Sequence, residues 1–597
     1  MALTPAVICV SASGAETARR IADLFEAPLH GREGRVKSAD VLFPNVLDHA
    51  RDLFAAGTPL IGVCAAGILI RAVAPLLADK RLEPPVLAVS EDGQSVVPLL
   101  GGHRGANVLA RQIADALVTT PAITTAGDRA LGVALDVPPT GYRLANPEDA
   151  KAAMAALLSG AGLRQEGERI FGIPDRNGAE SVTLKVTSHP ATGGPVQLVY
   201  HPQRYTLGVG SARGASPEGL QALAESMLAK AGIAPGALAA IGSVDIKADE
   251  PAVLNLAAAF DLPLRVFSPQ ELEAETPRLA NPSETVFAEV GCHGVAEGSA
   301  LALAGPEGHL VVEKQKTHEA TCALAVAPAP FVEALPGHPR GHLALVGIGP
   351  GKAAWRTPEV SKLIADADDL VGYGLYLDLL GPLGVGKRRH DFPLGGEEAR
   401  CRFALEEASK GRRVALVCSG DAGIYAMGAL IFELLDRGAV SEASKRVEVV
   451  SAPGVSALQA AAAKAGAPLG HDFCAISLSD LLTPRDDIVR RIHAAAEGDF
   501  VIAFYNPVSK TRRTLLSEAR NILLDHRPVD CPVLLASSLG REAEALHYRR
   551  LCDLTVDEVD MLTVVIVGSS QSRLFARGEG PAFYTPRGYA KKQEVQL

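Results

Sequence analysis

The feature that most constrains the fold is a short apolar run that recurs along the chain and ends each time in small residues. Such runs stand in "PAVICVSAS" (5–13), "PLIGVCAAG" (59–67), "PPVLAVSEDG" (84–93), "LALVGIG" (343–349), "RVALVCSG" (413–420), "RVEVVSAPG" (446–454), "DFVIAFYNP" (499–507), "CPVLLASS" (531–538) and "LTVVIVGSS" (562–570). Helical patterns such as "GAETARRIADLFEA" (14–27) and "PEGLQALAESMLAKAG" (217–232) stand between them. Strand–loop–helix units of this kind predict a multidomain α/β protein, with ligands bound at the strand ends.

The length predicts several domains, because 597 residues exceed what one hydrophobic core supports. The stretch "VAPAPFVEALPGHPRGH" (326–342) is rich in Pro, Ala and Gly, which is typical of a linker. We expect the following division: an N-terminal α/β domain at 1–118, a middle segment at 119–203, a further α/β domain at 204–328, a linker at 329–341 and a last domain at 342–585.

Composition excludes several classes of protein. The nine cysteines never form a C-x-x-C pair, which argues against a disulfide framework or a zinc site and favours a reducing cytoplasm. A formal net charge of −10 gives no general attraction to nucleic acid. The apolar run from Leu60 to Ile70 stops at Arg71, short of the roughly 18 residues that a membrane-spanning helix needs. We therefore expect a cytoplasmic protein without a metal, a membrane or a nucleic-acid partner.

The loop "GIGPG" (347–351) raises the question of the cofactor. A dinucleotide-binding loop needs a third glycine at position 352, where this chain has Lys352, and Pro350 favours a turn over an immediate helix. This argues against an NAD-dependent oxidoreductase. Two more strand ends carry small residues, "SGDAGIYAMG" (419–428) and "APGVSA" (452–457). Three such loops in one domain indicate backbone closing on a flat or extended ligand. Asp421 is either a local turn acceptor or a ligand contact, and we favour the contact.

The order "GIGPG", "SGDAGIY", "PGVSA" and "FYNP" makes residues 341–585 resemble the tetrapyrrole (corrin/porphyrin) methyltransferase family, which binds S-adenosylmethionine between two α/β subdomains. More narrowly, "VGYGLYLDL" (371–379), "GHDFCAISLSDLLTPRDDI" (470–488) and "YNPVSKTRR" (505–513) resemble precorrin-3B C(17)-methyltransferases, which methylate ring D and contract the macrocycle to precorrin-4 on the way to vitamin B12. The resemblance implies a homodimer through this half. It leaves open whether the substrate carries cobalt.

The resemblance also implies site residues. The cofactor-binding positions would be Gly349, Pro350, Ser419, Gly420, Asp421, Ile424, Ser456, Ala457 and the backbone near Asn506. Methyl transfer is an in-line displacement that positioning can promote by about 7–11 kcal/mol, so no nucleophilic side chain is needed. Arg513 could hold a substrate carboxylate. Asp480 could move protons during ring contraction or could cap the helix that follows it.

The first half has its own resemblance. "CAAGILIRAVAPLL" (64–77), "EDGQSVVPLLGGHRGANVLA" (91–110), "GVGSARGASPEGL" (208–220) and "GVAEGSALALAG" (294–305) make residues 1–328 similar to cobalt-precorrin-5A hydrolases of cobalamin biosynthesis, which open a lactone and release acetaldehyde. His103 is the candidate base that would activate water, or else a buried structural histidine. Arg71 would pair with a substrate carboxylate or with a buried acid. Ser211 stands where relatives often have Cys, so a non-catalytic tetrapyrrole carrier is the alternative for this half.

Overall fold

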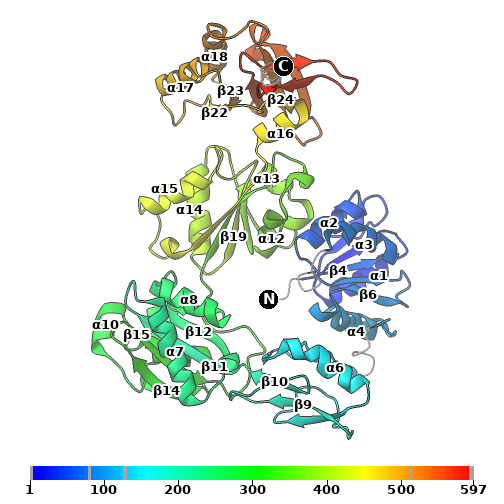
Figure 1. The fold of residues 1–597 in the computed structure, drawn as a ribbon, viewed down its shortest axis with the longest axis vertical. Coiled ribbons are helices and arrows are strands. Elements are labelled where there is room, and N and C mark those ends of the chain that lie inside the picture. The colour runs from blue at the N-terminus through cyan, green and yellow to red at the C-terminus, as the bar shows by residue number, and fades with distance from the viewer. Residues whose placement is uncertain (1–3, 78–82, 125–130, 510–511, 590–597) are drawn as a thin grey trace.

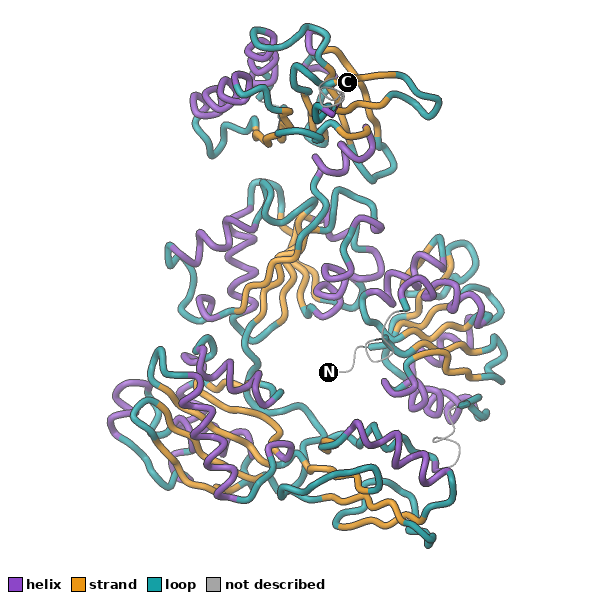
Figure 2. The backbone as a smooth tube through the Cα atoms, in the orientation of Figure 1, coloured by secondary structure: helices purple, strands orange, loops and turns teal. Residues whose placement is uncertain are grey.

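The computed structural model describes residues 4–77, 83–124, 131–509 and 512–589. Within them the chain forms six sheets, most of them flanked by helices. Figure 1 shows separate blocks along the chain, the last of which holds two of the sheets. Figure 2 shows helices packed on the faces of the strands in most blocks. The predicted multidomain α/β class is confirmed. No helix of the described residues is long and apolar enough to cross a membrane.

The N-terminal sheet has the strand order β3-β2-β1-β4-β5-β6. Its elements are β1 (Ala6–Cys9), α1 (Ala15–Leu24), β2 (Leu29–Arg32), β3 (Val41–Phe43), α2 (Val46–Ala55), β4 (Leu60–Val63), α3 (Ala66–Val73), β5 (Val86–Val89), β6 (Val96–Leu100) and α4 (Ala106–Leu117). All neighbouring pairs are parallel except β5 with β6, which is antiparallel. The carboxyl end of β6 therefore lies at the opposite edge of the sheet from the carboxyl ends of β1, β4 and β5.

Two further sheets complete the first half. The middle sheet, β7-β10-β9-β8, comprises β7 (Tyr142–Leu144), α6 (Ala150–Leu158), β8 (Gly162–Glu166), β9 (Ser181–Val186) and β10 (Gln197–Pro202). The next sheet, β13-β12-β11-β15-β14, comprises β11 (Tyr205–Ser211), α7 (Pro217–Ala231), β12 (Leu238–Val244), α8 (Pro251–Phe260), β13 (Leu264–Phe267), α9 (Pro269–Glu273), α10 (Glu284–Val290), α11 (Val295–Ala304), β14 (His309–Lys316) and β15 (Ala320–Val326). Its strands β11, β12 and β13 are parallel, so their carboxyl ends share one edge.

The stretch read as a linker lies against β13. His338 and Val266 exchange two backbone hydrogen bonds of 2.8 and 2.9 Å. The Arg265 guanidinium also donates to the carbonyls of Leu335, Pro336 and Gly337. These contacts attach the start of the second half to the edge of the preceding sheet, which the Pro- and Gly-rich composition did not indicate.

The second half consists of two sheets and a small three-stranded one. The first sheet, β18-β17-β19-β16-β20, is entirely parallel. Its elements are β16 (His342–Gly347), α12 (Pro358–Asp366), β17 (Asp369–Tyr373), α13 (Gly374–Asp378), β18 (Arg388–Phe392), α14 (Glu397–Ala408), β19 (Arg413–Cys418), α15 (Gly428–Asp436) and β20 (Glu448–Ala452). Leu343, Leu345 and Leu416 are fully buried, as the apolar runs predict for a parallel sheet covered on both faces.

The last block has the mixed sheet β22-β23-β26-β24-β25 and the small sheet β21-β28-β27. Its elements are α16 (Ala457–Ala465), β21 (Gly466–Ala467), β22 (Phe473–Ser477), α17 (Arg485–Glu497), β23 (Val501–Tyr505), α18 (Leu515–Leu524), β24 (Pro532–Ser537), β25 (Ala545–Arg550), β26 (Thr563–Val567), β27 (Arg573–Phe575) and β28 (Ala582–Tyr584). Strand β23 is parallel to β22, and both β23 and β24 are antiparallel to β26. The carboxyl ends of β22, β23 and β24 therefore meet at one edge.

The N-terminal block packs on the first sheet of the second half, although the two are far apart in sequence (Figure 1). One hydrophobic core contains residues of both, including Phe54 and Leu69 from the first and Ile364 and Leu383 from the second. Arg356, whose side chain is 2% exposed, lies 3.5 Å from Asp52 across this contact. Burial lowers the pKa of Arg356 and raises that of Asp52, against the mutual attraction of the two charges.

The contact makes a prediction about Asp52. The substitution Asp52→Ala leaves the buried Arg356 without its acidic partner and should destabilise the docked blocks by roughly 1–3 kcal/mol. Asp48→Ala, which removes an exposed pair with Arg51, is the matched control and should cost little. Thermal denaturation of the full chain measures both. Equal midpoints for the two variants would contradict the docking.

Candidate active site

Three glycine loops meet at the carboxyl edge of the first sheet in the second half. They follow β16, β19 and β20, which are neighbours in the sheet. Gly349 and Gly420 exchange two backbone hydrogen bonds of 2.9 and 3.1 Å, and both have a positive φ, 76° and 71°. A Cβ added to Gly454 would lie 2.1 Å from the carbonyl oxygen of Gly420 and 2.6 Å from that of Gly347. The close contact between the loops therefore already requires glycine at these positions, before any ligand is considered.

Asp421 ties two of these loops together. Its Oδ1 accepts a 2.8 Å hydrogen bond from the Gly423 N–H in its own loop, and its Oδ2 accepts a 2.9 Å bond from the Gly454 N–H in the third loop. Of the two roles considered from the sequence, the local turn contact is present. The second oxygen bonds another loop of the protein, and the ligand contact stays a prediction. Asp421 positions the edge from which a ligand would be held.

The other predicted cofactor residues lie around the same edge. Pro350 is buried in the first loop, and Ser456 is buried directly before α16, where its N–H donates to the Gln459 side chain at 2.8 Å. Ile424 is 37% exposed, so an apolar side chain faces outward beside the glycine loops. Ser419 and Ala457 complete the second and third loops, both partly buried. The structure therefore brings these residues together.

The second edge of the candidate site comes from the last block. Loops after β22, β23 and β24 meet there, and Arg541 from the last of them donates a 3.0 Å hydrogen bond to the Pro350 carbonyl. A Cβ on Gly351 would lie 2.9 Å from the Leu539 carbonyl oxygen. The loop Ser538–Arg541 was not among the predicted site residues. Its signal was the run "CPVLLASS", which ends in small residues in the same way as the glycine-loop strands.

Two tyrosines join the edges. The Tyr425 hydroxyl, from the second glycine loop, donates to the Ala475 carbonyl in β22 at 2.9 Å. The Tyr505 hydroxyl, at the end of β23, accepts from the Leu458 N–H at 3.0 Å. The two rings lie 5.2 Å apart. Burial raises the pKa of both phenols, which keeps them as neutral hydrogen-bonding groups.

Three residues in the loops of these two edges have a strained backbone. Tyr425, Asn506 and Ser538 have positive φ angles of 51°, 48° and 49°. For side chains other than glycine this region costs roughly 1–3 kcal/mol, and it persists where the surroundings impose it. Asn506 is exposed, and its amide donates to the Ser477 hydroxyl at 3.1 Å. That the backbone near Asn506 contacts the cofactor stays a prediction.

Asp480 lies in the loop after β22, and Arg513 lies in the loop after β23. Asp480 is half-buried and 3.7 Å from Arg512. Helix α17 begins only at Arg485, so the alternative role of Asp480 as a helix cap is wrong. Arg513 donates to Asp557 at 2.7 Å, so a substrate carboxylate would have to compete with an exposed acid. The neighbouring residues 510–511 lie outside the described residues.

The two N-terminal candidates lie at different ends of their sheet: the His103 loop is at the amino edge, whereas the Arg71 guanidinium reaches back to Gly67, near the carboxyl end of β4. Because β6 runs antiparallel, the loop that holds His103 lies beside Pro84 and Pro85, which precede β5. Arg71 is exposed in the last turn of α3, and its Nη1 donates to the Gly67 carbonyl of the same helix at 3.0 Å. At the carboxyl ends of β1 and β5, Glu91 accepts hydrogen bonds from two serine hydroxyls, Ser11 and Ser13.

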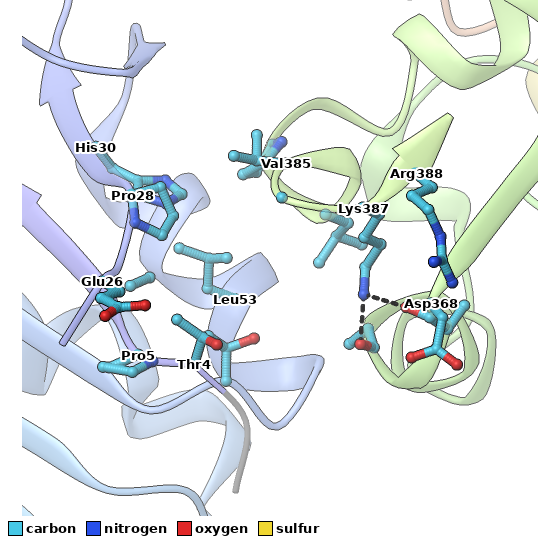
Figure 3. Close-up of a pocket in the computed structure, with 17 residues that line it drawn as sticks. Thr4, Pro5, Glu26, Pro28, His30, Leu53, Asp368, Val385, Lys387 and Arg388 are labelled. Atoms are coloured by element: carbon cyan, nitrogen blue, oxygen red, sulfur yellow. Dashed lines mark hydrogen bonds between the residues drawn. The ribbon is translucent and has the colours of Figure 1, made fainter. Parts of the chain in front are cut away.

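A cavity of about 570 Å³ lies between the N-terminal block and the second half (Figure 3). It opens between the amino ends of both sheets, beside Pro28 and Lys387, whereas parallel sheets bind ligands at their carboxyl ends. The Lys387 ammonium donates to the carbonyls of Ala365 and Ala367 (dashed in Figure 3). Two of its three N–H donors are thus used within the protein, and we assign this cavity to domain packing.

The geometry joins the loop-bearing edges of two α/β subdomains, and the first edge is lined by backbone. The family model "Tetrapyrrole (Corrin/Porphyrin) Methylases" matches residues 342–554, "Cobalamin synthesis G N-terminal" matches 48–128 and "Cobalamin synthesis G C-terminus" matches 205–325. The matches agree with both resemblances read from the sequence.

Three relatives extend this result. A precorrin-3B C(17)-methyltransferase from Sinorhizobium sp is 43% identical over 42% of this chain and 98% of the relative. A probable cobalt-factor III C(17)-methyltransferase from Salmonella typhimurium is 42% identical over 41% of this chain and 99% of the relative. Cobalamin biosynthesis protein CobIJ from Mycobacterium bovis is 37% identical over 53% of this chain, which spans 64% of that relative. The chain belongs to the tetrapyrrole methylase family, and its second half is a methyltransferase.

The loop geometry predicts unequal effects at the two aspartates. Asp421→Ala removes two hydrogen bonds to a charged acceptor, each worth roughly 1.5–3 kcal/mol, and should weaken S-adenosylhomocysteine binding at least about tenfold. Asp480→Ala, in the other subdomain, should leave this affinity unchanged. Calorimetry on the full chain measures both. Wild-type affinity in Asp421→Ala would reject the assignment of the glycine loops.

Proposed function

We propose that residues 342–585 transfer a methyl group from S-adenosylmethionine to carbon 17 of precorrin-3B, with ring contraction to precorrin-4. The observation that carries the proposal is the pair of facing carboxyl edges, joined at Arg541–Pro350 and Tyr425–Ala475. Such an arrangement can hold a cofactor on one edge and a broad substrate against the other. The similarity to the Sinorhizobium methyltransferase over nearly its whole length supports the choice of substrate.

The residues of the first edge fit S-adenosylmethionine. Its adenosine and amino-acid parts need hydrogen bonds from closely approaching backbone, which loops without bulky side chains allow. Gly349, Pro350, Gly420 and Ser456 would present that backbone, and Ile424 would contact the apolar face of the adenine. The cofactor supplies a methyl group already activated on a sulfonium sulfur. The remaining task of this chain is to orient the reactants and exclude water.

The second edge would hold the substrate. Precorrins carry many carboxylates, and arginine forks bind carboxylates well. Arg513 would exchange Asp557 for such a group, while the Arg512–Asp480 pair lies beside it. Asp480 would accept or return a proton during ring contraction. The protein would act as a homodimer in the cytoplasm, which sedimentation and fractionation can test.

A cobalt-containing substrate is the second candidate for the same site. The Salmonella relative, named for cobalt-factor III, is nearly as similar to this chain as the Sinorhizobium relative. Both substrates would present the same carboxylates to the same residues. Parallel assays with the metal-free and the cobalt-containing macrocycle separate the two.

For the first half we propose cobalt-precorrin-5A hydrolysis, with a tetrapyrrole carrier as the alternative. The matches to both cobalamin synthesis G models support the hydrolase. The position of His103 at the amino edge and the serine at position 211 favour the carrier. We also propose that the domains of the chain end at residues 118, 203, 328 and 341, as expected from the sequence.

Methyl transfer can be tested directly. The full chain, incubated with precorrin-3B and methyl-labelled S-adenosylmethionine, should place one labelled methyl group on the pigment. Mass analysis of the pigment reads the result. Label incorporated only with the cobalt-containing macrocycle would favour the second candidate, and no incorporation with either would refute both.

Acetaldehyde release decides the first half. Wild-type protein given cobalt-precorrin-5A should release acetaldehyde if His103 activates water, and His103→Ala should abolish release without changing methyl transfer. His309→Ala, at an exposed strand start, is the control histidine and should behave as wild type. A wild-type protein that binds the pigment but releases no acetaldehyde would be a carrier.

A further inference from the structure

A second cavity, of about 460 Å³, lies at the junction between the β13-β12-β11 edge and the second half. In volume it falls within the roughly 300–1,000 Å³ that bound small ligands occupy. One wall contains Asp245, which directly follows β12, and Ser268, which directly follows β13. These are carboxyl ends of parallel strands, the edge at which α/β sheets bind ligands.

The other wall comes from the methyltransferase half. It contains Gly341 before β16, Gly411 before β19 and Val447 before β20, which are the amino ends of that sheet. Figure 1 shows α8 and β12 lying next to this block. The methyltransferase half therefore covers the ligand-binding edge of the preceding sheet. The backbone pairing of His338 with Val266 holds the two walls together.

Charged groups in this junction cavity are only partly paired. Lys410 pairs with Glu407, and the Arg340 Nε donates to the backbone carbonyl of Arg446. The Arg446 guanidinium itself makes no hydrogen bond or ion pair with any residue that the structure describes.

On the facing wall, the Oδ1 atom of Asp245 is buried and has no hydrogen-bond partner among the described residues. Burial raises the pKa of Asp245, while the charge of Arg446 acts in the opposite direction. An unpaired guanidinium and an unpaired buried carboxylate oxygen thus share one cavity. Buried polar groups in folded proteins are almost always paired, so this site is suited to a ligand that can pair both.

We propose that the junction cavity binds a carboxylate-rich ligand, with Arg446 receiving a carboxylate and Asp245 accepting a hydrogen bond from a donor on the same ligand. Arg340 and Lys410 would add positive charge around it, and the one other acid among the described lining residues, Glu271, lies 3.9 Å from His338. If the proposed function holds, the ligand is the carboxylated rim of a tetrapyrrole, held between the two halves. A small polycarboxylate has the same chemistry and is the other source. Either way, the site needs both halves of the chain.

Hydrogen exchange of the full chain tests this proposal locally. The probes are uroporphyrin, a porphyrin with carboxylates on every pyrrole ring, and tricarballylate, a small tricarboxylate. We expect uroporphyrin to slow exchange in peptides that contain Asp245 and Arg446, separately from any protection at the glycine loops. Protection by tricarballylate as well would show that carboxylates alone suffice.

Matched variants connect the protection to the named residues. Arg446→Ala should weaken binding at the junction at least about tenfold, which corresponds to about 1.4 kcal/mol, and Asp245→Asn should weaken it less. Arg437→Ala, which removes an exposed arginine at the end of α15, should have no effect. Methyl transfer should survive in all three. Junction protection that persists without methyl transfer would overturn only the proposed function. No protection by either probe, or wild-type binding in Arg446→Ala, would overturn the junction site.

Discussion

The contact between the backbones of three glycine loops is the constraint on which the rest of the methyltransferase half depends. Gly349 and Gly420 pair as if they were two short strands, and Gly454 packs against the carbonyl oxygens of Gly420 and Gly347. No side chain fits between these loops. The edge they form is therefore lined by peptide groups, which suits a ligand that is recognised through backbone hydrogen bonds.

To enclose a ligand, this edge needs a second edge opposite it, which the last block provides. Strands β22, β23 and β24 all end on the same side, and the loop after β24 contacts the first glycine loop at Pro350 and Gly351. Strained residues at Tyr425, Asn506 and Ser538 surround the contact. Such strain persists only where the surrounding structure imposes it, and here the packing of the two subdomains does so.

Much of this arrangement could be predicted from the sequence, and the failures have physical reasons. The apolar runs ending in small residues predicted β1, β4, β5, β16, β19, β20 and β23, because buried strands in covered sheets need continuous apolar residues. The three glycine loops do follow strands of one domain, as expected, and the structure adds that those strands are neighbours in one parallel sheet. The spanning role of Asp421 was not foreseen, since it depends on which loop lies beside it. The loop at Ser538–Arg541 was missed because strand direction in a mixed sheet does not follow from composition.

Contacts between distant blocks were equally invisible in the sequence. The linker composition gave no sign that His338 pairs with Val266, and the reversal of β6, which moves the His103 loop to the amino edge, depends on one antiparallel pairing. The buried Arg356–Asp52 pair joins residues that belong to different halves. Long-range packing of this kind decides which strand edges stay open to ligands and which are covered.

A crystal structure of the full chain with S-adenosylhomocysteine would locate the cofactor site. We expect the ligand at the carboxyl edge of β16, β19 and β20, bonded mainly to the backbone of residues 347–351, 419–424 and 453–457. The Asp421 bonds to Gly423 and Gly454 should be retained. Binding at the N-terminal sheet, or a ligand held chiefly by side chains away from these loops, would contradict this expectation.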